Sequence, residues 1–215
     1  AIVALGGGFC TGEIISDQGL LMTNHHCGFG TIQANSTTEH DYLTDGFWAM
    51  TNEQEIPADF GVWFLNNISD VTDKVLEGLE DGMNEQQRDS LIKSNSNALK
   101  KFARDGQNKE DFNVQVKSFY YGNLYYMFTY DIYNDVRLVG APPSSIGKFG
   151  GDTDNWMWPR HTGDFTMFRV YADKENNPSS YNENNQPLKP KHSLPVSIAG
   201  VKDGDYAMIM GYPGS

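Results

Sequence analysis

Two adjacent histidines, His25 and His26, follow a pair of short apolar segments and a polar Thr-Asn dipeptide. Residues 10–15 and 20–23 have the composition of β-strands, and the Ser-Asp-Gln-Gly sequence between them is typical of a tight turn. A hairpin of this kind would hold the following backbone at the rim of a barrel while a histidine side chain projects into a cleft. An imidazole held in this way can act as a general base.

The order of hairpin, Thr-Asn-x-His and cysteine resembles the trypsin-like peptidases, in which the general-base histidine follows such a hairpin. This resemblance selects His26, which precedes Cys27 and is the third residue after Thr23. His25 would point to the opposite face of an extended segment and pack or hydrogen-bond locally. A metal site made of the two histidines is disfavoured, because adjacent residues seldom converge on one ion and no carboxylate lies nearby at helical spacing.

Cys10 and Cys27 are the only cysteines of the chain, and their types and spacing leave three roles open. They could be inert core residues, a metal pair or a disulfide. Zinc-ligand spacing is not evident, since the two residues are 17 positions apart and no second pair accompanies them. A disulfide is favoured only in an exported protein.

A histidine base needs a carboxylate that orients it and stabilises the imidazolium. The chain has 28 acidic residues, so composition alone does not select one. The unusual place is the segment 150–165, in which Trp156 and Trp158 flank a methionine and Gly163 precedes Asp164. Glycines let a backbone approach a ligand closely, and indoles supply flat apolar walls. The segment is therefore either a ligand-binding loop or a structural loop plugged by tryptophans.

Composition and charge limit the classes of protein. With 39% apolar and 13% aromatic residues, the chain is too hydrophobic to be disordered. Its 16 basic and 28 acidic residues give a net charge of −12, which argues against a nucleic-acid partner. No stretch approaches the roughly 18 consecutive apolar residues of a membrane helix, so no membrane-spanning role is expected.

Short aromatic and β-branched segments separated by turns predict a mainly β protein, either an antiparallel barrel or a sandwich. Residues 41–50 are expected to form a packed loop and residues 176–191 a solvated one. The expected strands are 1–5, 10–15, 20–23, 62–65, 113–121, 124–133, 135–139, 164–171, 195–198 and 206–210.

Residues 66–106 differ from this pattern and predict two helices inserted into the β-structure. Ser69 is the expected cap of the first helix, whose apolar residues then recur at helical spacing. Asn84 and Gln87 have the spacing of a capping box at the start of the second helix, which is expected to end at Asp105-Gly106.

Four longer segments make the resemblance specific: residues 23–28, 40–49, 150–164 and 211–214. Together they resemble the bacterial dipeptidyl-peptidase 7 and 11 family, serine peptidase family 46, along essentially the whole chain. The resemblance implies a chymotrypsin-like double β-barrel, of which residues 1–215 would form the first-barrel portion. It also implies an exported, periplasmic or cell-surface homodimer that removes dipeptides from the free N-terminus of peptides. A large helical domain and the second barrel would lie outside this chain, and no cofactor or metal is expected.

Carried over by motif, His26 is the general base and Asp164 its orienting acid. Asn155 and Trp156 fall where the family holds the substrate's α-amino group and the adjacent backbone, and a Cys10–Cys27 disulfide is implied. A side-chain carbonyl can accept from an ammonium group, which would fix the distance from the N-terminus to the scissile bond.

The chain departs from the expected triad in two ways. His26 and Asp164 are 138 residues apart, against about 45 in the chymotrypsin order, although the inserted segments can fill that gap. The serines near turns, Ser144, Ser145 and Ser215, lack the Gly-x-Ser-Gly setting whose amides form an oxyanion hole. The family's nucleophile lies downstream in the second barrel, so the chain alone is expected to be inactive.

Two other classes of function remain open from the residues themselves. One is a non-catalytic peptide- or glycan-binding β-module that uses Trp156 and Trp158 as a stacking platform. The other is a structural barrel with incidental histidines.

Overall fold

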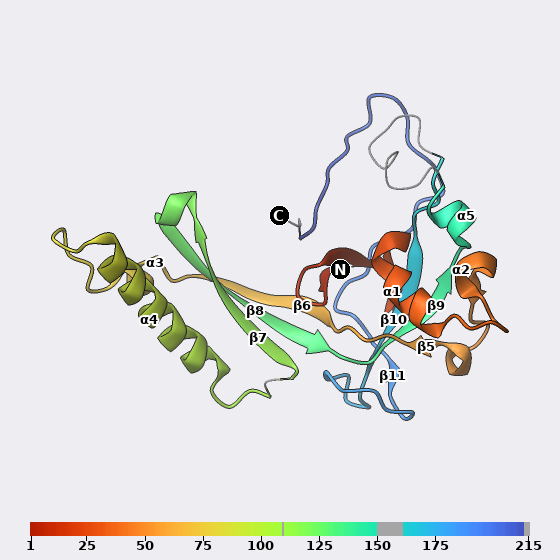
Figure 1. Ribbon diagram of the computed structural model, residues 1–215, viewed down its shortest axis with the longest axis horizontal. Helices are drawn as coiled ribbons and strands as arrows, with labels where there is room; N and C mark the ends of the chain where they lie inside the picture. The colour runs from red at the N-terminus through yellow and green to blue at the C-terminus, as the bar shows by residue number, and fades with distance from the viewer. Residues whose placement is uncertain (109, 150–160, 213–215) are drawn as a thin grey trace. The chain divides into compact units, whose positions relative to one another are not determined.

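The computed structural model describes residues 1–108, 110–149 and 161–212 of the chain (Figure 1). The chain divides into two compact units: the barrel unit, Ala1–Trp63 with Tyr133–Ser215, and the inserted unit, Phe64–Ile132. The expected class, a mainly β protein with antiparallel strands and few helices, is confirmed. Among the described residues, no helix has the length and apolar character needed to cross a bilayer.

The barrel unit contains short strands joined by turns, one helix of 11 residues and three helices of about one turn. Its helical elements are α1 (His25–Asn35), α2 (Tyr42–Asp45), η1 (Asn52–Gln54) and α5 (Ser144–Gly147). Its strands are β1 (Ile2–Leu5), β2 (Cys10–Ile14), β3 (Leu20–Thr23), β4 (Phe47–Trp48), β5 (Ile56–Pro57), the start of β6 (Val62–Asp70), β9 (Val136–Ala141), β10 (Thr166–Ala172) and β11 (Gln186–Pro187).

Strand pairing closes the sheet of the barrel unit on itself. All neighbours along the path β1-β2-β3-β10-β9 are antiparallel. Strand β5 pairs with β9 at Ile56 opposite Leu138, and shortly afterwards the start of β6 pairs with β1 at Val62 opposite Leu5. The segment 56–63 therefore reaches both ends of the path, which is the closure that defines a barrel.

The barrel interior is apolar and fully buried. Side chains from every part of the closed path contribute, and they alternate with more exposed neighbours on several strands, as a two-residue period requires. The residues at 0% exposure include Val3, Leu5, Ile14, Leu21, Val62, Leu138, Phe168 and Val170.

The predicted turn between β2 and β3 is present and depends on Gly19. This residue has a φ of +66°, and a Cβ atom there would lie 2.6 Å from the carbonyl oxygen of Val170. The Ser16 hydroxyl accepts hydrogen bonds from the backbone N–H groups of Gln18 and Leu20, at 3.2 and 3.1 Å. These contacts fix the register of the hairpin that precedes the two histidines.

The inserted unit contains the rest of β6, α3 (Thr72–Leu76), α4 (Glu85–Arg104), β7 (Phe112–Phe119), η2 (Tyr120–Gly122) and β8 (Leu124–Tyr133) (Figure 1). Tyr133, the last residue of β8, belongs to the barrel unit. Strand β8 is hydrogen-bonded to both β6 and β7. A separate core of buried residues, Val71, Val75 and Tyr125, packs against Leu76, Ile92, Leu99, Val116 and Met127.

The expected helical insertion at 66–106 differs from the observed unit in both composition and boundaries. Residues 66–70 continue strand β6, and the unit extends to Ile132 because it includes the β7–β8 hairpin. The first helix starts at Thr72 rather than after Ser69: the Asp70 carboxylate accepts from the Thr72 N–H at 2.9 Å and from its hydroxyl at 2.7 Å. Pairing with β8 outweighs the weak helical pattern of this segment.

The predicted capping box of the second helix is confirmed. The Asn84 side chain accepts from the Gln87 N–H, and the Gln87 side chain accepts from the Asn84 N–H, both at 3.0 Å. The helix ends at Arg104, directly before the predicted Asp105-Gly106 stop, where Gly106 has a φ of +77°.

We expect Asn84→Ala to destabilise the inserted unit by about 1 kcal/mol, because the Gln87 N–H loses its acceptor and the reciprocal bond loses its geometry. The matched control is Asn97→Ala, an exposed substitution in the middle of the same helix that should be neutral or slightly stabilising. Amide hydrogen exchange over residues 85–104 measures both variants. Equal protection in the two variants would contradict a role for the box.

Two predicted strands near the end of the chain are wrong: residues 195–198 and 206–210 have no strand assignment. Their apolar side chains are solvent-exposed, Ile198 at 99% and Ile209 at 101%. The barrel path is already closed by residues 56–63, so these segments have no free edge of that path to join. The loop expected at 176–191 instead contains β11, which pairs with β10 at Gln186 opposite Ala172.

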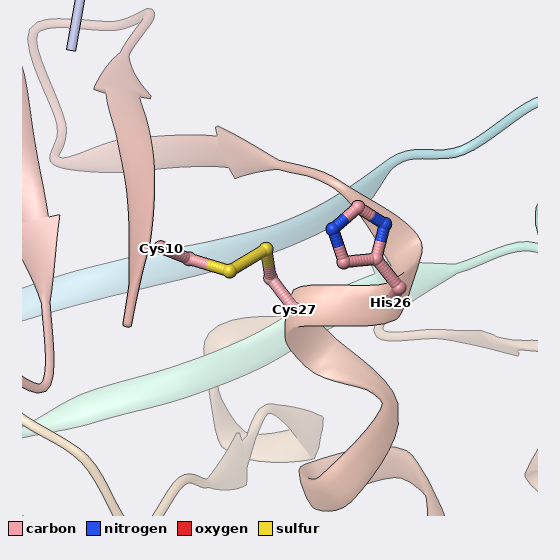
Figure 2. Close-up of side chains that lie close together, drawn as sticks. All are labelled: Cys10, His26 and Cys27. Carbon is pink, nitrogen blue, oxygen red and sulfur yellow. A yellow bond between two sulfur atoms is a disulfide. The ribbon is translucent and has the colours of Figure 1, made fainter. Parts of the chain in front are cut away.

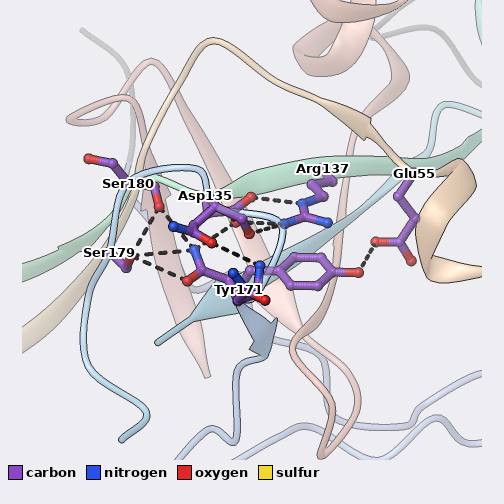
Figure 3. Close-up of polar contacts among 9 residues, drawn as sticks. Glu55, Asp135, Arg137, Tyr171, Ser179 and Ser180 are labelled. Atoms are coloured by element: carbon purple, nitrogen blue, oxygen red, sulfur yellow. Dashed lines mark hydrogen bonds and ion pairs between the residues drawn. The ribbon is translucent and has the colours of Figure 1, made fainter. Parts of the chain in front are cut away.

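A buried polar cluster holds this loop against the barrel (Figure 3). Arg137 makes two bonds to the Asp135 carboxylate, at 2.9 and 2.8 Å, and its guanidinium lies 3.8 Å from the ring centroid of Tyr171. The Tyr171 hydroxyl donates to Glu55 at 2.8 Å, and burial, reinforced by this carboxylate, raises the tyrosine pKa. Asp135 also accepts from the side chain of Asn185 at 2.9 Å, which fixes the loop.

Candidate active site

The two histidines lie at the start of a helix rather than on an extended segment. Asn24 is the N-cap of α1, with φ −69° and ψ 152°, and His25 and His26 are the first two helical residues. The two side chains therefore diverge by the roughly 100° of a helical step and do not lie on opposite faces of a strand. His25 is 1% exposed, whereas the His26 side chain is 53% exposed.

Strand pairing brings Asp164 to His26 across 138 residues of sequence. Strands β3 and β10 are antiparallel with Thr23 opposite Thr166. The residues that follow β3 must therefore lie beside those that precede β10. The expected strand 164–171 begins two residues later than predicted, so Asp164 lies in the approach to β10 rather than in the strand.

The carboxylate of Asp164 binds both the ring and the backbone of His26. Oδ2 lies 2.9 Å from His26 Nδ1, and Oδ1 accepts from the His26 N–H at 3.1 Å. Asn24 donates from Nδ2 to Oδ2 at 3.1 Å and to the Asp164 carbonyl oxygen at 3.2 Å. The negative charge also lies at the positive end of the α1 dipole, which stabilises it there.

This arrangement selects one protonation pattern of the imidazole. A carboxylate at Nδ1 favours the tautomer in which Nδ1 carries the proton, so the lone pair is on Nε2. The same carboxylate stabilises the imidazolium once Nε2 has taken a proton. The pair can therefore serve as a base at Nε2 with its charge balanced at Nδ1.

His25 packs inside the barrel unit, as expected of the histidine that is not the base. Its ring lies against Gly147, where a Cβ atom would be only 2.3 Å from His25 Cδ2. Burial lowers the His25 pKa, and the opposing effect of the Asp164 charge is smaller. His25 is therefore held neutral beside the pair.

Cys10 of β2 and Cys27 of α1 form a disulfide, with their Cα atoms 6.2 Å apart (Figure 2). The bond ties the first turn of the helix that carries His26 to the barrel wall. A crosslink that closes a loop of this size stabilises a fold by about 3 kcal/mol. Within the described ranges, the two cysteine sulfur atoms and one ring nitrogen of His26 lie within 4.8 Å of one another.

Several sequence predictions fall outside the described residues. These are the substrate-binding residues Asn155 and Trp156, the platform residue Trp158, and Ser215. Asp152 and Asp154, the other acids of the segment 150–165, lie outside the described residues as well. Of the remaining serines considered as nucleophiles, Ser144 has a buried hydroxyl oxygen that is closed to a substrate. Ser145 is exposed on the short helix α5.

Two functional features were missed at the level of sequence. Asn24 was part of a motif without a role, yet it occupies the N-cap position of α1 and its side chain donates twice to Asp164 rather than capping the helix; its place in the Thr-Asn-x-His motif was the available signal. The Asp135–Arg137 pair was also missed, although an i, i+2 spacing places both residues on one face of extended backbone.

Comparison with known proteins defines the class to which this barrel and its His–Asp pair belong. The Peptidase S46 family profile matches residues 1–215. The Asp/Glu-specific dipeptidyl-peptidase of Porphyromonas gingivalis is 54% identical over 219 residues, covering 100% of this chain and 30% of the relative. Dipeptidyl-peptidase 7 of Phocaeicola vulgatus is 53% identical over 218 residues, with 99% and 30% coverage.

A solved structure is similar as well. The crystal structure of Porphyromonas endodontalis DPP11 in complex with substrate has a TM-score of 0.81 and 45% identity, covering 95% of this chain and 30% of that one. The chain thus spans about 30% of the length of the relatives it matches. The chain belongs to the Peptidase S46 family.

Proposed function

We propose that the protein containing this chain is a serine-type dipeptidyl-peptidase that releases dipeptides from the free N-terminus of peptides. The observation that carries the proposal is the 2.9 Å contact between His26 Nδ1 and Asp164 Oδ2, with a half-exposed imidazole. The names of the relatives support the same class, since they are dipeptidyl-peptidases.

In the proposed mechanism, His26 Nε2 removes the proton from a serine hydroxyl as that oxygen attacks the scissile carbonyl. The protonated ring then gives its proton to the leaving amine, which yields an acyl-enzyme, and water reverses the sequence. Asp164 remains ionised and stabilises the imidazolium in each half-reaction.

The serine and the oxyanion hole are proposed to come from a second barrel of a chymotrypsin-like fold, outside residues 1–215. The chain spans about 30% of its relatives, which supports such a contribution from elsewhere in the protein. We therefore propose that residues 1–215 alone lack peptidase activity.

Asn155 and Trp156 are proposed to bind the substrate's α-amino group and adjacent backbone. An ammonium group anchored at Asn155 would set a fixed distance to the scissile bond and so limit the product to a dipeptide. The disulfide supports an oxidising location, and we propose that the protein is exported to the periplasm or cell surface and acts as a homodimer.

A fluorophosphonate probe tests the reaction class in the full-length protein. We expect covalent labelling of one serine in the wild type, and strongly reduced labelling in His26→Gln, because the base that activates the nucleophile is lost. Exposed His192→Gln is the matched control and should label like the wild type. Absence of labelling in folded wild-type protein would favour a binding module or a scaffold.

Paired substrates test the exopeptidase assignment. Asn155→Ala is expected to lower kcat/KM on peptides with a free amino terminus and to leave turnover of N-terminally blocked peptides unchanged. Equal losses on both substrates would refute the proposed contact with the α-amino group.

A further inference from the structure

We propose that Cys10, Cys27 and His26 form a binding site for Zn²⁺ or a similar thiophilic divalent cation when the disulfide is reduced. The three ligand atoms already lie within 4.8 Å of one another. Figure 2 shows the His26 ring beside the disulfide, with one ring nitrogen on the side of the two sulfur atoms. Two thiolates and one imidazole are a typical donor set for zinc.

The geometry requires only small movements of the side chains. Zn–S and Zn–N bonds of about 2.3 and 2.0–2.1 Å in a tetrahedron place the ligand atoms about 3.6–3.8 Å apart. After reduction the two sulfurs separate to a distance of this order, and the sulfur–nitrogen separations must shorten by at most about 1.2 Å from their present upper limit of 4.8 Å.

The partner of His26 supplies an independent reason for metal binding. A histidine ligand almost always donates its other ring N–H to a carboxylate or carbonyl group, which orients the ring and raises its basicity. His26 already has this arrangement, because Nδ1 faces Asp164 Oδ2 at 2.9 Å. The lone pair of Nε2 is therefore presented in the form that a metal requires.

A dithiol can serve as the reductant of the Cys10–Cys27 disulfide. The dithiol transfers two electrons and two protons to the Cys10–Cys27 bond, leaves as a cyclic disulfide, and yields two thiols. The cation then replaces the two thiol protons, which are released, and accepts the lone pair of His26 Nε2. Both cysteines are partly exposed and the His26 side chain is 53% exposed, so a small reductant and a cation have access. Water or chloride would occupy the fourth position.

The expected effect of the cation on catalysis rests on the proposed function. A cation bound to His26 Nε2 would occupy the lone pair that accepts the serine proton. Reduction followed by metal binding would thus inhibit the peptidase, and a chelator with reoxidation would restore it. The site itself does not depend on the peptidase reaction, so the binding test below separates the two proposals.

Cobalt is the probe for the test, because Co²⁺ bound to thiolates absorbs in the near ultraviolet and tetrahedral Co²⁺ has intense visible bands. The full-length protein is reduced with dithiothreitol, freed of reductant without air, and titrated with Co²⁺ and then Zn²⁺. We expect one Co²⁺ per chain with both sets of bands, displacement by Zn²⁺, and no such bands in the oxidised protein. Cys10→Ser/Cys27→Ser should abolish them.

Variants of the imidazole and its partner separate a built site from adventitious thiol binding. Asp164→Asn should weaken Co²⁺ binding about 10–100-fold, as expected for loss of a histidine's hydrogen-bond partner. His26→Gln should weaken it further and change the visible bands. His192→Gln, at an exposed histidine of the same unit, should match the wild type.

Equal affinities for wild type, His26→Gln and His192→Gln would overturn the site, as would equal weakening by the two histidine variants. Circular dichroism of the reduced protein completes the test. Loss of the β-sheet signal on reduction would also overturn the proposal, because the three ligands would no longer be held together. Metal binding without peptidase inhibition would retain the site and contradict the proposed role of His26 as base.

Discussion

If the full-length protein is the proposed dipeptidyl-peptidase, Asp164→Asn is expected to lower its kcat on the order of 10⁴-fold while leaving the fold intact. The carboxylate accepts three donors from two residues: the His26 N–H at Oδ1, and the His26 ring and Asn24 Nδ2 at Oδ2. An asparagine has one acceptor oxygen. If that oxygen keeps the backbone bond that caps α1, its NH2 group must face the His26 ring.

An NH2 group at that position donates to Nδ1 and so moves the imidazole proton to Nε2. The ring then has no lone pair at Nε2 for the proton of the proposed serine nucleophile, although the fold around it is kept. Steady-state kinetics on a free-amino peptide measure the loss, and circular dichroism checks the fold. Asp203→Asn, at an exposed acid of the same unit, is the control and should retain full turnover. Undiminished turnover in Asp164→Asn would assign the orienting role to another acid, with Asp152 and Asp154, the other acids of the segment 150–165, as the nearest rivals.

The pairing of His26 with Asp164 was predictable from long motifs but not from local pattern. What joins the two residues is the register of β3 against β10, with Thr23 opposite Thr166. The residues in and around β3 and β10 do not by themselves indicate this register, because it is fixed by strand pairing throughout the barrel. Motif resemblance placed the two residues together because the motifs record the outcome of such long-range pairing, and the 2.9 Å contact agrees with that placement; their catalytic roles stay predictions.

Local propensity predicted the wrong secondary structure in two segments, because their glycine or polar residues are unfavourable for the helix or strand that tertiary packing stabilises. The helix α1 contains Gly28 and Gly30, which have low helix propensity, so its first turn was interpreted as extended chain. Gly28 is nevertheless required, because a Cβ atom there would lie 2.7 Å from Thr166 Cγ2. Similarly, the Asn-Asn-Ile-Ser-Asp sequence at 66–70 lacks strand character and is held in β6 by its partner β8.

Strong local signals were sufficient elsewhere. The Ser-Asp-Gln-Gly turn, the capping box at Asn84 and the aromatic strand 124–133 each combine a sequence preference with a matching tertiary role. Segments 195–198 and 206–210 show the limit of such signals. Val196 and Ile198 alternate with their neighbours and 206–210 is a continuous apolar run, both typical of strands, but neither pattern specifies a partner strand.

Arg137→Met is expected to destabilise the barrel unit by about 3–5 kcal/mol, because it leaves the Asp135 carboxylate buried without its counter-ion. The Asp135 side chain is 0% exposed, and Arg137 supplies two of its bonds. The guanidinium also stacks between Tyr171 and Tyr181, at 3.8 and 4.9 Å from their centroids. Methionine replaces the apolar stem of the arginine but neither the charge nor the planar face.

A double variant separates the cost of an unpaired charge from the loss of packing. Asp135→Asn/Arg137→Met removes both charges and should recover part of the stability lost in the single variant, because the uncompensated carboxylate is gone. Urea unfolding of the full-length protein, followed by amide exchange over β9 and β10, measures both. Since Arg137 also donates to the Asn182 carbonyl oxygen at 3.1 Å, limited proteolysis should cut the 176–191 loop first in Arg137→Met. Equal stability of the single variant and the wild type would show that the loop and the barrel are held by their backbone pairing, through β11 on β10, rather than by this ion pair.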